Sequence, residues 1–472
     1  MPGPDPHLPE TPDARPRRFD SWSARLNHPV LEPGDPGYDD ARRVWNARFD
    51  PRPGVIVRPR DSEEVAQAVV LAGKEGLPVA IKGGGHAYAG NSVADGALLL
   101  DLGRMRGVTV DAEARRAVVQ GGATWADVDA ATTPLGLATP GGTVSSVGVA
   151  GFTLGGGAGW LTRSFGMAVD NLTAVEMVTA AGERVRASEE TNPELFWGLR
   201  GGSGNFGVVT EFEFRLHEIP PRLLFGQVLY PLERAKELLR FYRGVFASAP
   251  DALAAFPFFI RIPPLPVFPE AIHGQVVLDF VVCWTGDPAE GEEWVQPFRE
   301  QGEPLMDTVG LLPYAELQTS FDAGMGYGNR WYSRWLLLDE LSDRFIDALV
   351  DGLDPFPGPL TAVYLGALGG AAGRVSPGAT AYPHRQATDA LHVFPGWMDP
   401  EDDERVMAWA RRLYQSLQPF AADGVYVNML AEDEKDRIPS AYGSNYARLR
   451  ELKSRWDPEN VFRANHNIRP EG

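Results

Sequence analysis

Apolar residues between about positions 55 and 216 come in short runs typical of strands, separated by segments with helical spacing. One such segment begins at Asp61, where Glu64 three residues later completes a capping pattern, and it ends at Gly76. The pattern also predicts strands at 55–57, 79–81, 97–102, 108–110, 117–120 and 208–216, a hairpin over 175–186, and helices over 124–132 and 192–199. This alternation predicts an α/β region.

The pattern changes after about residue 217. Aromatic and aliphatic strands now alternate with Pro-rich turns and with amphipathic helices such as 233–246 and 403–417. The first forty residues are polar and Pro-rich, and order is expected from about Val44. We therefore predict an arm over 1–40, a first domain over 41–216, a second domain over 217–430 that shapes a pocket, and a C-terminal segment over 431–472.

The length of 472 residues suits two domains better than a single core. The net charge of −19 argues against nucleic acid or an anionic membrane surface as a partner. Cys283 is the only cysteine, so an intramolecular disulfide and a cysteine-based metal cluster are excluded. The eight histidines show no metal-binding spacing, so no catalytic metal is expected. No apolar run is typical of a leader or a membrane span, which favours a cytoplasmic protein.

Three glycine clusters lie in the first domain, at 82–86 (Lys-Gly-Gly-Gly-His), 151–159 and 201–207. Consecutive glycines allow backbone N–H groups to approach a ligand closely, and successive N–H groups form a nest for an anion such as a diphosphate. Tight turns are the alternative explanation for any one cluster. Three clusters in one domain, one of them next to His86, favour ligand binding.

The third cluster also contains the spacing of a dinucleotide fingerprint, Gly202-x-Gly204-x-x-Gly207. That fingerprint must follow a strand and open a helix, so that the helix N-terminus meets the pyrophosphate. Here a predicted helix precedes the glycines and a predicted strand follows them. A Rossmann site is therefore rejected.

The run 78–90 (Pro-Val-Ala-Ile-Lys-Gly-Gly-Gly-His-Ala-Tyr-Ala-Gly) closely resembles the FAD-binding loop of the vanillyl-alcohol-oxidase / p-cresol-methylhydroxylase superfamily, in its berberine-bridge-enzyme-like branch. The segments 141–159 and 195–209 resemble that branch's second and third flavin loops, and 442–462 resembles its terminal signature. The resemblance implies an α+β, two-domain vanillyl-alcohol-oxidase-like fold. Two α/β subdomains would bind FAD, a helix-covered antiparallel sheet would bind substrate, and the C-terminal segment would return to the FAD domain.

In this family the histidine after the glycine turn bonds to the 8α carbon of the flavin ring, which here is His86. Many members add a bond from a cysteine in the second loop, where this chain has Val144, and Cys283 lies in an apolar run typical of a core strand. The resemblance therefore implies FAD held covalently through His86 only. The other cofactor-binding residues that it implies are Lys82, Gly83, Gly84, Gly85, Ala87, Gly90, Gly142, Thr143, Val147, Gly148, Gly151, Gly155, Gly156, Val209, Asn465 and Asn467.

Three residues are candidates for the chemistry on the substrate. Tyr426 and Asn428 resemble the family's Tyr-x-Asn-Tyr strand, with Met429 in place of the second tyrosine, and alternation would put both on one face. His392 lies on a predicted strand that lines the site in relatives, and its near-neutral titration suits a general base, although a core histidine is an equal alternative. If the second tyrosine is the catalytic one, this chain has lost it.

The resemblance implies an FAD-linked oxidase that takes a hydride from a small alcohol, amine or activated C–H compound and passes the electrons to O2, forming H2O2. Val147 occupies the family's oxygen-gate position, where a small residue favours an oxidase, although a plain core valine is the alternative. Asn465 and Asn467 have an alternative as Asx-turn residues. A dehydrogenase or tailoring enzyme with another outcome, and a non-catalytic flavin sensor, remain alternatives. The substrate stays open, and the protein is expected to be a monomer or a homodimer.

Overall fold

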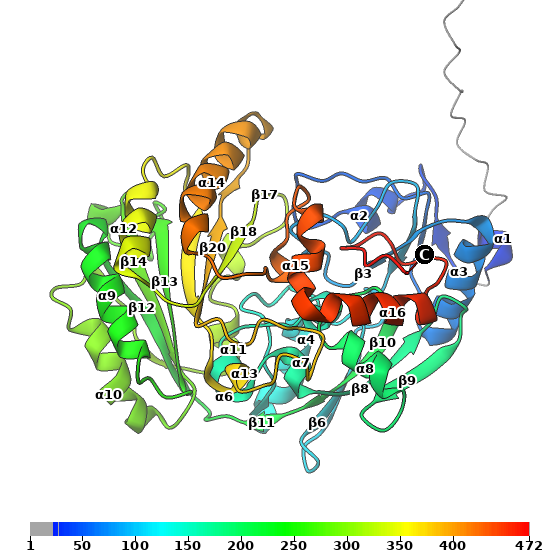
Figure 1. Cartoon of the computed structure of the whole chain (residues 1–472), viewed down its shortest axis with the longest axis horizontal. Helices are drawn as coiled ribbons and strands as arrows, with labels where there is room; N and C mark the ends of the chain where they lie inside the picture. The colour runs from blue at the N-terminus through cyan, green and yellow to red at the C-terminus, as the bar shows by residue number, and fades with distance from the viewer. Residues whose placement is uncertain (1–21, 27, 472) are drawn as a thin grey trace, which may run out of the picture.

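The computed structural model describes residues 22–26 and 28–471 (Figure 1). Its first sheet has four strands in the order β1 (Val30–Leu31), β2 (Val55–Val57), β4 (Leu98–Asp101) and β3 (Val79–Lys82). The last three strands are parallel, and α3 (Ser62–Glu75) connects two of them. The Asp61 side chain accepts from the backbone N–H of Glu64, and Gly76 ends the helix at φ +67°, as the sequence predicts.

The second sheet is antiparallel and has five strands, in the order β5 (Val108–Asp111), β6 (Arg116–Gln120), β10 (Val208–Arg215), β8 (Leu172–Val178) and β9 (Arg184–Ser188). Helix α4 (Trp125–Thr132) begins after its cap Thr124, and α8 (Pro193–Leu199) precedes the third glycine cluster while β10 follows it. This order confirms that the glycines do not form a dinucleotide fingerprint. The short helices α5 (Val149–Leu154), α6 (Thr162–Phe165) and α7 (Ala168–Asn171) surround the second cluster.

The third sheet has eight strands and comes from the second half of the chain. Its order is β15 (Met306–Asp307), β12 (Leu223–Pro231), β14 (Val276–Trp284), β13 (Leu253–Arg261), β19 (Ala362–Ala367), β20 (Asp389–Phe394) and β18 (Arg334–Leu338), with β16 (Gly310–Leu312) also paired to β12. Four helices cover its outer face: α9 (Ala235–Phe246), α10 (Pro288–Arg299), α12 (Asp343–Gly352) and α14 (Asp403–Leu417) (Figure 1). Because strand side chains alternate, the residues between the core positions face the first half of the chain.

The C-terminal segment lies against the first half of the chain (Figure 1). Helices α15 (Ile438–Tyr442) and α16 (Tyr446–Trp456) follow the sheet domain, and α16 packs on α8. The fully buried Lys453 donates to Asp457 at 2.6 Å and to the carbonyl oxygen of Asn205 at 2.8 Å. This buried ion pair fixes the segment beside the third glycine cluster.

Short elements complete the described chain: α1 (Trp22–Arg25), α2 (Tyr38–Arg42), α11 (Tyr314–Gln318), α13 (Gly370–Gly373), the pair β7 (Leu137–Ala138) with β11 (His217–Glu218), and the pair β17 (Arg330–Trp331) with β21 (Gly396–Trp397). The described part of the predicted arm therefore has structure, because β1 pairs with β2 and Trp22 is buried in the first core. Residues 1–21 of that arm lie outside the described residues. Within the described chain, no helix is long and apolar enough to cross a membrane.

Candidate active site

A cavity of about 390 Å³ lies where the three glycine clusters meet the third sheet. The first cluster packs directly against the backbone of Gly148, which precedes the second cluster in the chain. A Cβ built on Gly84 would lie 2.8 Å from Cα of Gly148, and one built on Gly148 would lie 2.9 Å from Cα of Gly84. Real Cβ atoms essentially never show such separations, so this contact requires glycine on both sides. The close backbone approach forms the floor of the cavity.

His86 projects from this floor and lines the cavity. Its ring stacks on Trp45 at 5.1 Å between centroids, and Tyr327 meets it edge-on at 5.6 Å. Burial lowers the pKa of His86 to about 4, so the imidazole is neutral at physiological pH. Nε2 lies 3.0 Å from Oγ of Ser146, and Nδ1 has no hydrogen-bond partner among the described residues. The ring therefore presents one free nitrogen.

Twelve of the predicted cofactor residues line the cavity: Gly83, Gly84, Gly85, His86, Ala87, Gly142, Thr143, Val147, Gly148, Gly151, Val209 and Asn465. Its described lining contains no aspartate or glutamate, which suits a dianionic diphosphate. The buried Oδ1 atom of Asn465 has no hydrogen-bond partner among the described residues. The glycine floor, the acid-free lining and this unpaired amide oxygen fit FAD.

Five predicted cofactor residues do not line the cavity. Lys82 turns to the carbonyl oxygen of Ala41 and lies 3.8 Å from Asp101, while Gly90 lies against the Phe49 ring. The others outside the lining are Gly155, Gly156 and Asn467. These positions support the loops rather than form the wall.

Tyr426 and Asn428 hold the second glycine cluster. The backbone N–H of Gly157 donates to Oη of Tyr426 at 2.7 Å, and Asn428 donates to the same hydroxyl at 3.0 Å. A Cβ on Gly155 would lie 2.6 Å from Cγ of Asn428, so the glycine makes room for the amide. Burial raises the pKa of Tyr426 to about 12 in spite of these donors.

The strand predicted over 425–429 is wrong. Val427–Met429 forms a 3₁₀ turn, and the two side chains meet because the turn brings them to one loop. Both still line the cavity, as the sequence predicts. The described residues 425–429 pair with no strand, so the alternation that the sequence suggested has no sheet to belong to.

His392 lies on β20 but does not line the cavity. It is fully buried, burial lowers its pKa to about 3, and its Nδ1 lies 3.3 Å from Oη of Tyr364. Tyr364, on β19, does line the cavity. The expectation that His392 itself faces the substrate is therefore corrected: a tyrosine that sequence reasoning missed stands between them.

The part of the cavity facing the third sheet is aromatic. Phe256 and Phe258 of β13 line it together with Trp160, Phe321 and Trp335. The Nε1–H donors of Trp160 and Trp335 are buried without a hydrogen-bond partner among the described residues. We call this the aromatic lobe. Its surface suits a flat apolar molecule that offers an acceptor atom.

Three other aromatic residues of the second domain lie away from this lobe. Phe259 points into the core under the helices, and Trp331 stacks on Trp45 at 5.1 Å. Tyr332 donates to Asp433 at 2.7 Å. Alternation along β13 could have excluded Phe259, because it is one residue out of phase with Phe256 and Phe258.

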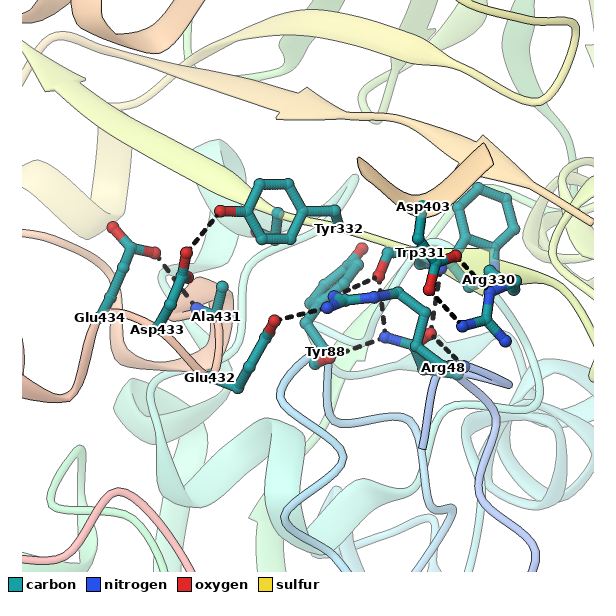
Figure 2. Close-up of polar contacts among 12 residues, drawn as sticks. Arg48, Tyr88, Arg330, Trp331, Tyr332, Asp403, Ala431, Glu432, Asp433 and Glu434 are labelled. Carbon is teal, nitrogen blue, oxygen red and sulfur yellow. Dashed lines mark hydrogen bonds and ion pairs between the residues drawn. The ribbon is translucent and has the colours of Figure 1, made fainter. Parts of the chain in front are cut away.

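A polar junction holds the C-terminal segment directly after the Tyr426 turn (Figure 2). Glu432 pairs with Arg48 of the first half of the chain at 2.6 Å. The next residue, Asp433, accepts from Tyr332 at 2.7 Å and pairs with Arg334 of the third sheet at 2.7 Å. Adjacent carboxylates thus tie the turn to both halves of the chain.

The comparisons with known proteins agree with this architecture. Residues 53–188 match the family of FAD binding domains, and residues 425–469 match the family described as berberine and berberine like. (R)-6-hydroxynicotine oxidase of Paenarthrobacter nicotinovorans is 31% identical over 94% of this chain and 97% of its own.

Two solved structures show the same fold. The structure of 6-hydroxy-D-nicotine oxidase from Arthrobacter nicotinovorans superposes with a TM-score of 0.86 at 27% identity, covering 94% of this chain and 98% of that one. Glucooligosaccharide oxidase from Acremonium strictum, whose FAD is 6-S-cysteinyl and 8α-N1-histidyl, gives 0.83 at 25% identity, covering 94% and 97%.

Fold and site define an FAD-linked oxidoreductase. The chain belongs to the berberine-bridge-enzyme-like FAD-linked oxidases of the vanillyl-alcohol-oxidase / p-cresol-methylhydroxylase superfamily. The predicted family, fold class and enzyme class are confirmed.

Proposed function

We propose that this FAD-dependent oxidase holds its flavin covalently through His86 alone and oxidises a small, flat, largely apolar alcohol or amine. The observation that carries the proposal is the cavity itself, in which a glycine floor with a neutral histidine opens into an aromatic lobe. FAD supplies a two-electron acceptor there when it is bound.

The residues around His86 support a covalent link. A neutral imidazole has a lone pair available for bond formation, and Ser146 occupies one ring nitrogen while the other stays free. Stacking on Trp45 fixes the plane of the ring. These contacts hold His86 as a nucleophile in one orientation.

A second link has no candidate group. Val144 lines the cavity where a cysteine would be needed. Cys283 is fully buried on β14, outside the cavity lining, and burial raises the pKa of its thiol to about 12. The link is therefore single.

The substrate class follows from the aromatic lobe. Sugars need a dense set of hydrogen-bonding side chains, whereas this lobe consists of aromatic faces with small residues such as Ala254 and Gly366 between them. The buried indole N–H groups of Trp160 and Trp335 have no hydrogen-bond partner among the described residues, which favours a substrate that carries an acceptor atom. A flat molecule with a carbonyl, ether or phenol oxygen satisfies both requirements.

Molecular oxygen is the proposed electron acceptor, with H2O2 as product. Val147 lines the cavity and is only partly buried, so a small side chain stands at the predicted gate. A dehydrogenase or a tailoring enzyme is the alternative outcome. We further propose the domain boundaries 41–216 and 217–430, with a C-terminal segment over 431–472, and a cytoplasmic location.

One experiment tests the proposal in two steps. Purified protein is precipitated with acid, and the flavin absorbance of pellet and supernatant is measured; the yellow colour must stay in the pellet. The flavin is then photoreduced without oxygen and mixed with air. Reoxidation within seconds with stoichiometric H2O2 supports the oxidase, and reoxidation over many minutes assigns a dehydrogenase instead.

A further inference from the structure

Tyr364 and His392 form a pair across neighbouring strands of the third sheet. They are direct partners in the register of β19 and β20, on the face that points toward the cavity. Tyr364 lines the cavity, and His392 lies behind it with no exposed surface. Any molecule in the aromatic lobe meets the tyrosine first.

The direction of each hydrogen bond in this pair follows from Ser333. Its Oγ lies 2.7 Å from the carbonyl oxygen of Met429, which can only accept, so Ser333 donates its proton there. Toward His392, Ser333 must then accept, and Nε2, at 2.9 Å, carries the hydrogen. The Nδ1 atom of His392 is consequently an acceptor, and Tyr364, at 3.3 Å, donates to it.

Because Tyr364 donates its proton to His392, the lone pairs of its hydroxyl oxygen are free to accept a hydrogen bond from a molecule in the cavity. The hydroxyl proton of Tyr364 is held by the buried Nδ1 atom of His392. Phe258 stacks on the Tyr364 ring with 4.7 Å between the ring centroids, and this stacking fixes the plane of the tyrosine ring. Tyr88, two residues after His86, packs edge-on against His392 at 5.4 Å. The pair therefore lies beside the loop that carries the proposed flavin link.

We propose that Tyr364 accepts the proton of the substrate's reacting O–H or N–H group while its own proton passes to Nδ1 of His392; the inference rests on the proposed function. FAD, when bound, would supply the acceptor for the hydride of the reacting carbon, so that the C=O or C=N bond of the product can form as Tyr364 takes the proton. The substrate thus loses one hydride and one proton, and H2O2 would take up the same two electrons and two hydrogens from O2, with the proton returning from His392 through Tyr364. Ser333 and His392 are positioning residues that fix the direction of transfer.

The pair is neutral at rest. Burial lowers the pKa of His392 to about 3 and raises that of Tyr364. The proton therefore moves only as the hydride leaves, and the positive charge that results lies on the buried His392, behind Tyr364 and outside the lining of the apolar lobe. Loss of the tyrosine hydroxyl should slow hydride transfer without loosening the flavin.

The first test reads the tautomer in the holoenzyme. ¹⁵N-histidine labelling, with His392→Gln to assign the signal, is expected to show the Nε2–H form, and Ser333→Ala should shift it toward a mixture. An Nδ1–H form in the parent protein would overturn the inference, because Tyr364 could not then donate. This result does not depend on any substrate.

The second test uses 2-naphthalenemethanol and 2-naphthalenemethylamine as probes in stopped-flow flavin reduction. Tyr364→Phe is expected to lower the reduction rate by about 10²–10⁴-fold with KM and flavin content unchanged. Tyr230→Phe is the matched control, since it removes a buried hydroxyl bonded to the Phe298 carbonyl oxygen on the opposite face of the same sheet.

The outcomes separate the two proposals. A Tyr364→Phe rate within threefold of the parent overturns the proton role while leaving the oxidase intact. If the parent protein keeps its flavin but neither probe reduces that flavin, the proposed substrate class is wrong. The proton role of Tyr364, which rests on that class, is then overturned as well.

Discussion

Substituting Gly148 by alanine tests its backbone contact with Gly84 of the first glycine cluster. The new Cβ would lie 2.9 Å from Cα of Gly84 and still closer to its amide nitrogen, whereas ordinary contacts begin near 3.4 Å. The amide nitrogen, at 2.2 Å, is the tightest contact, so the two backbones must separate by about 1.2 Å for it to reach ordinary contact. Backbone cannot rotate out of the way as a side chain can, so the cost should reach the upper end of overpacking penalties, about 3 kcal/mol.

The assay is the free energy of unfolding in urea, followed by far-ultraviolet circular dichroism, together with the flavin absorbance per polypeptide after gel filtration. Both should fall, because the displaced floor no longer fits the cofactor. Gly73→Ala is the control: this helix glycine has nothing within 4 Å, and its replacement should stabilise by about 0.5–1 kcal/mol. If Gly148→Ala unfolds like the parent and holds its full flavin, the packing argument is wrong.

Two further predictions concern the site, and a third concerns Asp279, which is buried on β14. His86→Ala is expected to leave all flavin soluble after acid precipitation, while Ser146→Ala slows covalent incorporation into apoprotein, measured as acid-stable absorbance over time; full attachment in the first variant contradicts the link. Tyr426→Phe leaves the buried N–H of Gly157 unpaired and should cost about 1–3 kcal/mol in urea unfolding, so an unchanged midpoint counts against its role. Burial raises the pKa of Asp279 to about 8, so the folded state keeps a proton that the unfolded chain loses above its ordinary pKa. The contribution of Asp279 to stability is then complete below about pH 4 and is lost as the pH rises through about 8, and Asp279→Asn should remove this contribution from the pH dependence in thermal unfolding scans.

Local signals were enough to predict much of the fold. Asp61 caps its helix and Gly76 ends it, as their sequence positions indicate. The hairpin turns at Gly182 with φ +80°, where glycine is required. The strand β1 could not be found, because two residues at an edge carry no periodic pattern and are ordered only by pairing with β2.

The site was predicted where chemistry is local in sequence. His86 and the glycines before it lie on one short loop, so their pattern can be found in the sequence without knowing the tertiary structure. Tyr364 was missed because its role depends on a strand partner 28 residues away and on Ser333, which no spacing rule connects. The aromatic lobe likewise combines Trp160 and Trp335 from distant parts of the chain.

The covalent link is the central claim, and mass spectrometry of a proteolytic digest tests it most directly. The holoenzyme is denatured, digested and searched for the peptide that contains His86. We predict that this peptide carries flavin on the imidazole and that no other peptide does, including the one that contains Cys283. An unmodified His86 peptide from fully yellow protein, or flavin on a second residue, would contradict the account.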